Sequence, residues 1–181
     1  GKLVNIILYG AQLRILGKNF LPVYFDATYD LFRTEKYRIT RSDTGAIPAF
    51  VGWQANLGFS LLKDRLVFNV TLDGPFKRVA TETIDGVAPE DNFVNYPHLR
   101  AVFILGEGLL PGFYFDASYD KKLLRSLKDL IDPQSAVIGA RINFKTGPAV
   151  ISLVYSLRYN PELEGDKWEI TSGLNTSLSL F

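Results

Sequence analysis

The stretch that decides the fold reads Val51-Gly52-Trp53-Gln54-Ala55-Asn56-Leu57-Gly58-Phe59-Ser60-Leu61-Leu62. From Val51 to Leu61 every second side chain is apolar, and the residues between are glycines, amides and a hydroxyl. This period of two is typical of a strand with one apolar and one polar face. The run over residues 66–73 repeats the pattern after only three intervening residues. The sequence therefore predicts a β-hairpin here.

Similar alternation predicts strands along most of the chain, over residues 3–16, 23–32, 99–105, 113–123, 136–145, 149–159 and 168–180. With the hairpin this makes about nine strands, most of them near the roughly 9–11 residues that a tilted strand needs to cross a bilayer. Strands of soluble proteins average about 5–6 residues. We therefore expect an all-β fold, an antiparallel transmembrane β-barrel of about 8–10 meandering strands. Residues 1–181 would form one barrel domain or barrel segment.

The composition excludes several other classes of protein. With 20 basic and 19 acidic residues well mixed, the chain gives no reason to expect a nucleic-acid partner. It has no cysteine, so disulfides and thiolate sites are excluded. No run approaches the roughly 18 consecutive apolar residues of a membrane helix, so any membrane contact must come from strands.

The search for chemistry finds no nucleophile elbow, phosphate loop or zinc-protease helix. A Ser-His-Asp site would have to use His98, the only histidine, which is more simply explained as a residue at the end of a loop. We expect no catalytic residues, no metal and no cofactor, and hence a protein that is not an enzyme.

The predicted connections are of two kinds. Residues 17–22, 63–65, 106–112 and 145–148 are short, whereas residues 34–47, 74–97 and 125–134 are long and polar. Short turns at one rim and long loops at the other are typical of outer-membrane barrels. The loop over residues 74–97 would be the most prominent external feature.

Alternation alone does not say which face meets lipid, because a soluble barrel places its apolar face inward and a membrane barrel places it outward. Bulky aromatic side chains near strand ends favour the membrane, as an interfacial girdle: Trp53, Phe113, Phe144, Tyr155, Tyr159 and Trp168. The alternative is a soluble β-barrel that binds a hydrophobic small ligand in its interior.

The polar face carries opposite charges that suit a lumen: Asp26, Asp30, Asp116, Asp120, Arg141, Lys145 and Arg158. The two aspartate pairs, spaced by four residues on predicted strands, could serve as paired acids or a cation site. We favour a lumen-facing network in which these acids pair with the bases, because unpaired like charges in a narrow interior are costly.

An internal repeat is visible in the sequence. Residues 24–30 read Tyr-Phe-Asp-Ala-Thr-Tyr-Asp, and residues 114–120 repeat them with one change, threonine to serine. The flanking segments also align, since residues 51–57 parallel residues 138–144. We infer a four-strand unit used twice, over approximately residues 15–75 and 104–160.

The expected strand count is odd, whereas single-chain bacterial barrels have even numbers. If short turns lie on the inner rim, the strand over residues 3–16 would run inward from outside. We therefore expect further strands or domains of a longer chain, of which this is the C-terminal portion, or one uncounted strand near residues 36–41.

Residues 168–181 resemble the C-terminal targeting strand of bacterial outer-membrane proteins, with a mid-strand glycine, alternating apolar positions and a terminal phenylalanine: Gly173, Leu178, Leu180 and Phe181. Residues 139–155 also resemble the penultimate hairpin of the surface-antigen barrels, the insertase and translocase superfamily, although that family's plugging loop motif is not visible. These resemblances imply an integral protein of the bacterial outer membrane acting as a pore, transporter or protein-translocation barrel. Its partners would be membrane lipids and, through the last strand, the outer-membrane assembly machinery.

Overall fold

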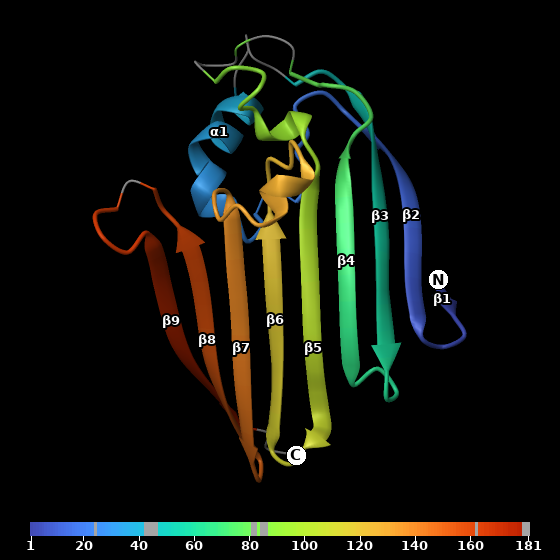
Figure 1. Ribbon diagram of the computed structural model, residues 1–181, viewed down its shortest axis with the longest axis vertical. Helices are drawn as coiled ribbons and strands as arrows, with labels where there is room; N and C mark the ends of the chain where they lie inside the picture. The colour runs from blue at the N-terminus through green and yellow to red at the C-terminus, as the bar shows by residue number, and fades with distance from the viewer. Residues whose placement is uncertain (24, 42–46, 81–82, 84–86, 162, 179–181) are drawn as a thin grey trace.

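The computed structural model describes residues 1–23, 25–41, 47–80, 83, 87–161 and 163–178. It contains one antiparallel sheet whose nine strands follow each other in chain order (Figure 1). The strands are β1 (Lys2–Leu3), β2 (Ile7–Leu16), β3 (Phe50–Leu61), β4 (Leu66–Pro75), β5 (His98–Leu110), β6 (Phe113–Lys121), β7 (Ala136–Thr146), β8 (Ala149–Tyr159) and β9 (Trp168–Leu178). One helix, α1 (Tyr29–Arg41), and two short 3₁₀ turns, η1 (Phe93–Asn95) and η2 (Leu127–Leu130), complete the described elements. The all-β prediction is confirmed.

The sheet is open. Within the described residues β1 and β9 each have one neighbour, so closure into a barrel is not observed. β1 is only two residues long and covers a small part of the free edge of β2. No described helix has the length and apolar character needed to cross a membrane.

The strand register joins the alternating patterns into two continuous faces. One row of facing residues runs Phe59–Phe68–Phe103–Ala117–Ala140–Tyr155 across β3 to β8. The neighbouring row on the other face runs Gly58–Asn69–Val102–Ser118–Gly139–Ser156. We call these the apolar face and the polar face of the sheet. The alternation of apolar and polar side chains is therefore in phase from β3 to β8.

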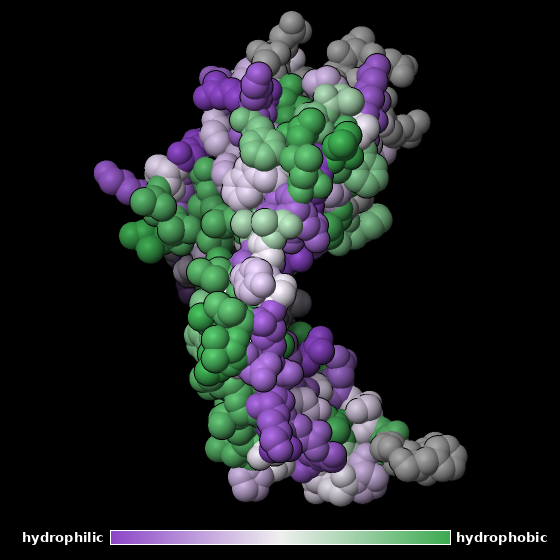
Figure 2. All heavy atoms as spheres, turned by 90° about the vertical axis from the view of Figure 1, so that its right-hand side faces the viewer, coloured by the Kyte–Doolittle hydropathy of each residue, from purple (hydrophilic) through white to green (hydrophobic). Residues whose placement is uncertain are grey.

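The apolar face is exposed. Leu13 on β2, Leu57 on β3 and Leu174 on β9 are each more than 60% accessible, at 68%, 65% and 64%. Figure 2 views the sheet from the β2 edge, with hydrophobic residues along one side of its lower half and hydrophilic residues beside them on the other. Nothing in the described chain covers the hydrophobic side at these three positions.

All long connections lie at one end of the sheet and all short ones at the other (Figure 1). The short connections are residues 4–6, 62–65, 111–112 and 147–148, and the long ones are residues 17–49, 76–97, 122–135 and 160–167. The prediction of two unlike rims is correct, but residues 17–22 belong to a long connection. β2 also runs from the short-turn end to the long-loop end, opposite to the predicted direction.

The strand predicted over residues 23–32 is wrong. Residues 25–28 form turns and bends, and α1 begins at Tyr29; it also occupies residues 36–41, where an uncounted strand was suspected. The buried side chains of α1 recur at Phe32, Lys36 and Ile39, which is a helical spacing. Thr28, directly before the helix, accepts hydrogen bonds from the Leu31 and Phe32 amides through its carbonyl.

The sequence repeat therefore does not translate into two equal structural units. Residues 114–120 lie in β6, paired on both edges by β5 and β7, whereas residues 25–30 lead into α1. The later hairpins, β3–β4 and β7–β8, do correspond. A four-strand duplication is thus not confirmed.

A small core packs α1 against the long connection between β4 and β5, at the long-loop end. Its buried members are Phe32, Ile39, Ile47, Val79, Ala80, Phe93 and Val94. Asn95 fixes this connection, because its side chain accepts from the Val79 and Ala80 amides and donates to the carbonyls of Ala80 and Pro89. We call α1, η1 and the connections around them the head.

Candidate functional site

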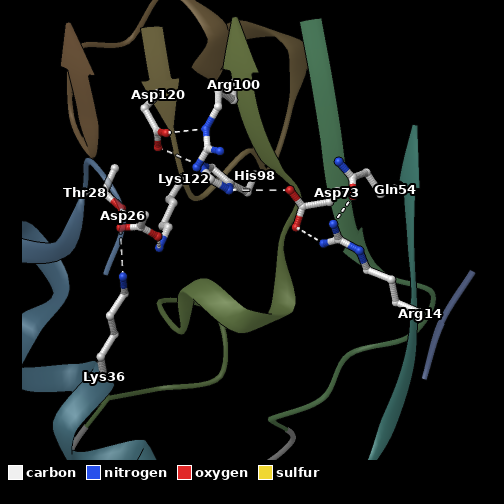
Figure 3. A network of polar contacts seen from close by, with 10 residues as sticks. All are labelled: Arg14, Asp26, Thr28, Lys36, Gln54, Asp73, His98, Arg100, Asp120 and Lys122. Carbon is white, nitrogen blue, oxygen red and sulfur yellow. Dashed lines mark hydrogen bonds and ion pairs between the residues drawn. The ribbon is translucent and has the colours of Figure 1, made fainter. Parts of the chain in front are cut away.

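The head lies against the polar face near the long-loop end, and ionic side chains from both meet there (Figure 3). Ion pairs to the sheet come from two parts of the head. Asp30 on α1 contacts Arg158 on β8 at 3.1 Å, and Asp26 before α1 contacts Lys122, directly after β6, at 2.7 Å. A pocket lies between the head and the strands β2 to β5.

One chain of polar contacts crosses the strands beneath the head. Arg14 on β2 donates to Gln54 on β3 and, at 3.4 Å, to Asp73 on β4. His98 on β5 follows, with Nδ1 3.6 Å from Asp73 and Nε2 2.6 Å from Asp120 on β6. Arg100 donates to the second Asp120 oxygen at 3.1 Å. The polar contacts therefore cross five neighbouring strands, with ionisable side chains on β2, β4, β5 and β6 and the neutral Gln54 on β3.

A second group of charges centres on Asp26, whose side chain is 3% exposed. Lys36 of α1 and Lys122 each contact one carboxylate oxygen, at 2.8 and 2.7 Å, and the Thr28 hydroxyl donates at 2.9 Å. Burial alone would raise the pKa of Asp26, but hydrogen bonds from the two ammonium groups outweigh it and lower the pKa to about 2. Asp26 is therefore ionised in the folded protein at neutral pH.

Lys122 experiences the opposite balance. Its ammonium group lies 4.9 Å above the Phe93 ring and 5.5 Å above the Phe32 ring, inside the core of the head. Burial and the nearby Lys36 disfavour its charge more than Asp26 stabilises it, so its pKa is lowered from 10.5 to about 8. The ion pair between Asp26 and Lys122 thus holds the head in place, although burial disfavours the charged form of Lys122.

The pocket under the head has a volume of about 130 Å³. Its charged lining comes from the strands and from the Asp26 group: Arg14, Asp26, Lys36, Asp73, His98, Arg100 and Lys122. Its apolar lining comes from the head, including Leu21, Pro22, Phe93 and Val94, and from the strands, including Leu16 and Phe50. The space therefore has charged and apolar lining residues on both sides.

The structure places the seven predicted polar residues at several locations. Asp116 and Arg141 face each other across β6 and β7 on the polar face. Asp120 binds His98 and Arg100, and Lys145 binds Glu107 at 2.5 Å near the short-turn end. Asp26 and Asp30 are not on a strand, so the predicted pair on one strand face does not exist.

Sequence reasoning missed several members of the network: Arg14, Lys36, Gln54, Asp73, Arg100 and Lys122. On the strands a usable signal was present, because Arg14, Asp73 and Arg100 occupy polar-phase positions, and the register places them in three successive rows across β2, β4 and β5. Lys36 and Lys122 carried no such signal, since their roles depend on how α1 docks.

All six predicted girdle residues lie on the apolar face. Trp53, Tyr159 and Trp168 are near the long-loop end, Phe113 and Phe144 near the short-turn end, and Tyr155 lies between. Phe113 packs edge-on against Phe144 and Tyr159 against Trp168, with ring centroids 5.6 Å apart in both pairs. Two further aromatic pairs lie on the apolar face towards the short-turn end, Phe59 with Phe68 and Phe103 with Phe115. Their proximity follows from the strand register and is not visible in the sequence alone.

The predicted targeting strand is β9 as far as Leu178, with Gly173 on the polar face and Leu178 on the apolar face. Leu180 and Phe181 lie outside the described residues. Beyond Trp168 and Glu169, the strand is exposed along its described length.

The geometry gives no support to catalysis by His98, because both ring nitrogens face carboxylates. Neither nitrogen is left to accept a proton from a nucleophile. In the part of the chain that the structure describes, no three His, Cys, Asp or Glu side chains are grouped to hold a metal ion.

Comparisons of the chain with known protein families, with curated proteins and with solved structures find no match.

Proposed function

We propose that this chain forms part of the wall of a transmembrane β-barrel in the bacterial outer membrane, acting as a pore, a transporter or a protein-translocation barrel. The observation that carries the proposal is the exposed apolar face, continuous across β2 to β9. Lipid solvates such a face, whereas water does not. The polar face would line the lumen, and the head would narrow it at the long-loop end.

The open edges of the sheet support closure by further strands. An unpaired backbone N–H or C=O costs several kcal/mol in lipid, so open sheet edges do not occur within the hydrocarbon region. In this proposal β2 and β9 pair with strands that the described residues do not supply, from a longer chain or a second copy.

The corresponding hairpins β3–β4 and β7–β8 fit such a wall, since residues 51–57 and 138–144 have the same phase. We infer that a hairpin duplication, smaller than the four-strand unit suggested by the sequence, contributed to the sheet.

A soluble barrel with a hydrophobic ligand inside would need the apolar face turned towards an enclosed space. Here the head and its pocket lie on the polar face instead. The alternative therefore lacks a structural observation in its favour.

The test uses two neighbouring positions on β3 with opposite faces. Leu57→Lys places a charge on the apolar face and is expected to cost about 2–4 kcal/mol of stability in bilayers if the site is near the midplane. Asn56→Lys, on the polar face, should insert into vesicles nearly as well as the unaltered chain. The measurements are vesicle incorporation and urea unfolding from the bilayer.

Equal insertion of the two variants would contradict the proposal, as would an unaltered chain that stays monomeric in buffer without detergent. For a chain that inserts, planar-bilayer conductance separates an open pore from a barrel closed by its head.

A further inference from the structure

We propose that the pocket under the head binds a compact oxyanion, a phosphate or a carboxylate. The inference rests on the proposed function only in taking the polar face as the lumen; binding itself requires no membrane.

The first support is the charge of the lining. Four basic side chains line the pocket, Arg14, Lys36, Arg100 and Lys122, against two carboxylates, Asp26 and Asp73. Asp120, which binds His98 and Arg100 just behind this lining, brings the acids to three. The basic groups still outnumber the acidic ones before His98 is counted. An anion would offset this excess.

The second support is the supply of hydrogen-bond donors. A guanidinium has five N–H donors in a planar fork that matches two oxygens of a carboxylate or phosphate. Among the contacts of the described residues, Arg100 donates through Nε to Asp120, and its two terminal nitrogens have no recorded acceptor. Arg14 uses its terminal nitrogens on Gln54 and Asp73. Arg100 is therefore the group best placed to bind an oxyanion.

The third support is the size and polarity of the space. A water molecule needs roughly 10–15 Å³ of such volume, so about 130 Å³ accommodates a small oxyanion with some of its water. Leu21, Pro22, Phe93 and Val94 reduce the water around the bound ion. Charge-assisted hydrogen bonds are stronger in such surroundings than in open solvent.

A second, polar hollow lies next to the pocket on the same face. Gln54 lines both, and the second hollow adds the amides of Gln12, Asn56 and Asn69 with no carboxylate among its described lining residues. Asn56 donates to Asn69 at 3.3 Å, and Asn69 donates to Thr71 at 3.2 Å. These neutral donors and acceptors lead along β2 to β4 away from the head. They would let an anion leave the basic pocket without meeting a negative charge.

The experiment measures the ³¹P linewidth of inorganic phosphate with the detergent-solubilised protein at constant ionic strength. The unaltered chain should broaden the line saturably. Acetate should compete with phosphate if the pocket binds oxyanions in general. If only phosphate analogues compete, the pocket is specific for phosphate. Chloride at equal concentration should compete weakly.

Four variants test the assignment to this pocket. Arg100→Gln should weaken phosphate binding about tenfold or more. Arg100→Lys keeps the charge but loses the planar fork of donors, so its affinity should lie between those of the unaltered chain and Arg100→Gln. Arg125→Gln removes an exposed arginine that pairs with Asp91 in the head, and should leave binding unchanged. Asp73→Asn removes a competing carboxylate and should tighten binding, a result that misfolding does not produce.

The proposal is overturned if the unaltered chain shows no saturable broadening, or if Arg100→Gln and Asp73→Asn both bind as the unaltered chain does. Failure of the Leu57 and Asn56 test with phosphate binding intact would remove the membrane role and leave the anion site. Insertion into vesicles without phosphate binding would remove the anion site and leave the membrane role.

Discussion

Replacement of Asp26 by asparagine is expected to undock α1 from the sheet. The pKa of Asp26 is lowered from 3.8 to about 2, and each pKa unit corresponds to about 1.4 kcal/mol, so ionised Asp26 contributes about 2–3 kcal/mol to the folded state. Asparagine would also leave Lys36 and Lys122 buried without their carboxylate. Breaking a buried ion pair costs about 3–5 kcal/mol, and we expect an effect in this range at pH 7.

The pH dependence has a defined sign. Because the folded pKa lies below the unfolded value, the contribution of Asp26 is fully present above about pH 4 and is lost as the pH falls from about 4 to 2. The assay is hydrogen exchange of the α1 amides in detergent, corrected for the intrinsic rate at each pH. Asp91→Asn, which breaks an exposed pair with Arg125, serves as the control and should cost less than about 1 kcal/mol. The prediction is refuted if the α1 amides of Asp26→Asn stay as protected at neutral pH as those of the unaltered chain. It is also refuted if the difference in α1 protection between the two proteins does not become smaller as the pH falls from about 4 to 2.

Three further predictions follow from single residues. Raising the pH from 8 to 10.5 should strengthen docking of the head, because the folded pKa of Lys122 lies below its unfolded value and the unfolded chain binds more protons in this window; weaker α1 protection at pH 10 would contradict the burial of this charge. Glu35→Gln should stabilise α1 by up to about 1 kcal/mol in urea unfolding at pH 7, since burial and Asp91 raise the Glu35 pKa and its Oε2 atom is buried without a recorded partner in the described chain. Gly58→Ala should unfold β3 and β4, because a Cβ there would lie 2.2 Å from the Phe68 carbonyl oxygen, whereas Gly173→Ala meets nothing within 4 Å and should change the urea midpoint little.

The alternation of Val51–Leu62 and its neighbours was enough to predict the strands, the two faces of the sheet and the two unlike rims, because a strand's side chains have a fixed period. Residues 25–30 were misread because their side chains alternate with the same period of two as their near-copy at residues 115–120. The local alternation is the same, but β6 has a hydrogen-bonding neighbour on each edge and residues 25–30 precede a segment of helical period. A wider window over Phe32, Lys36 and Ile39 would have indicated the helix.

The candidate site was only partly predictable. The aspartates and Arg158 were recognised as charged residues of a polar face, but their partners were not, because contacts such as Lys122 with Asp26 depend on docking between distant segments. Sequence periodicity describes single strands and does not contain this information.

The meander order of the strands has a consequence for folding. Each strand pairs with the one before it, so the sheet can grow strand by strand, and the loops to be closed at the short-turn end are only two to four residues long. The pairs that hold α1 are different, since Lys122 lies 96 residues from Asp26 and Arg158 lies 128 residues from Asp30. Their loop-closure entropy is compensated only when the partners are already in place. We therefore expect α1 to reach its full protection from hydrogen exchange only after β8 has formed.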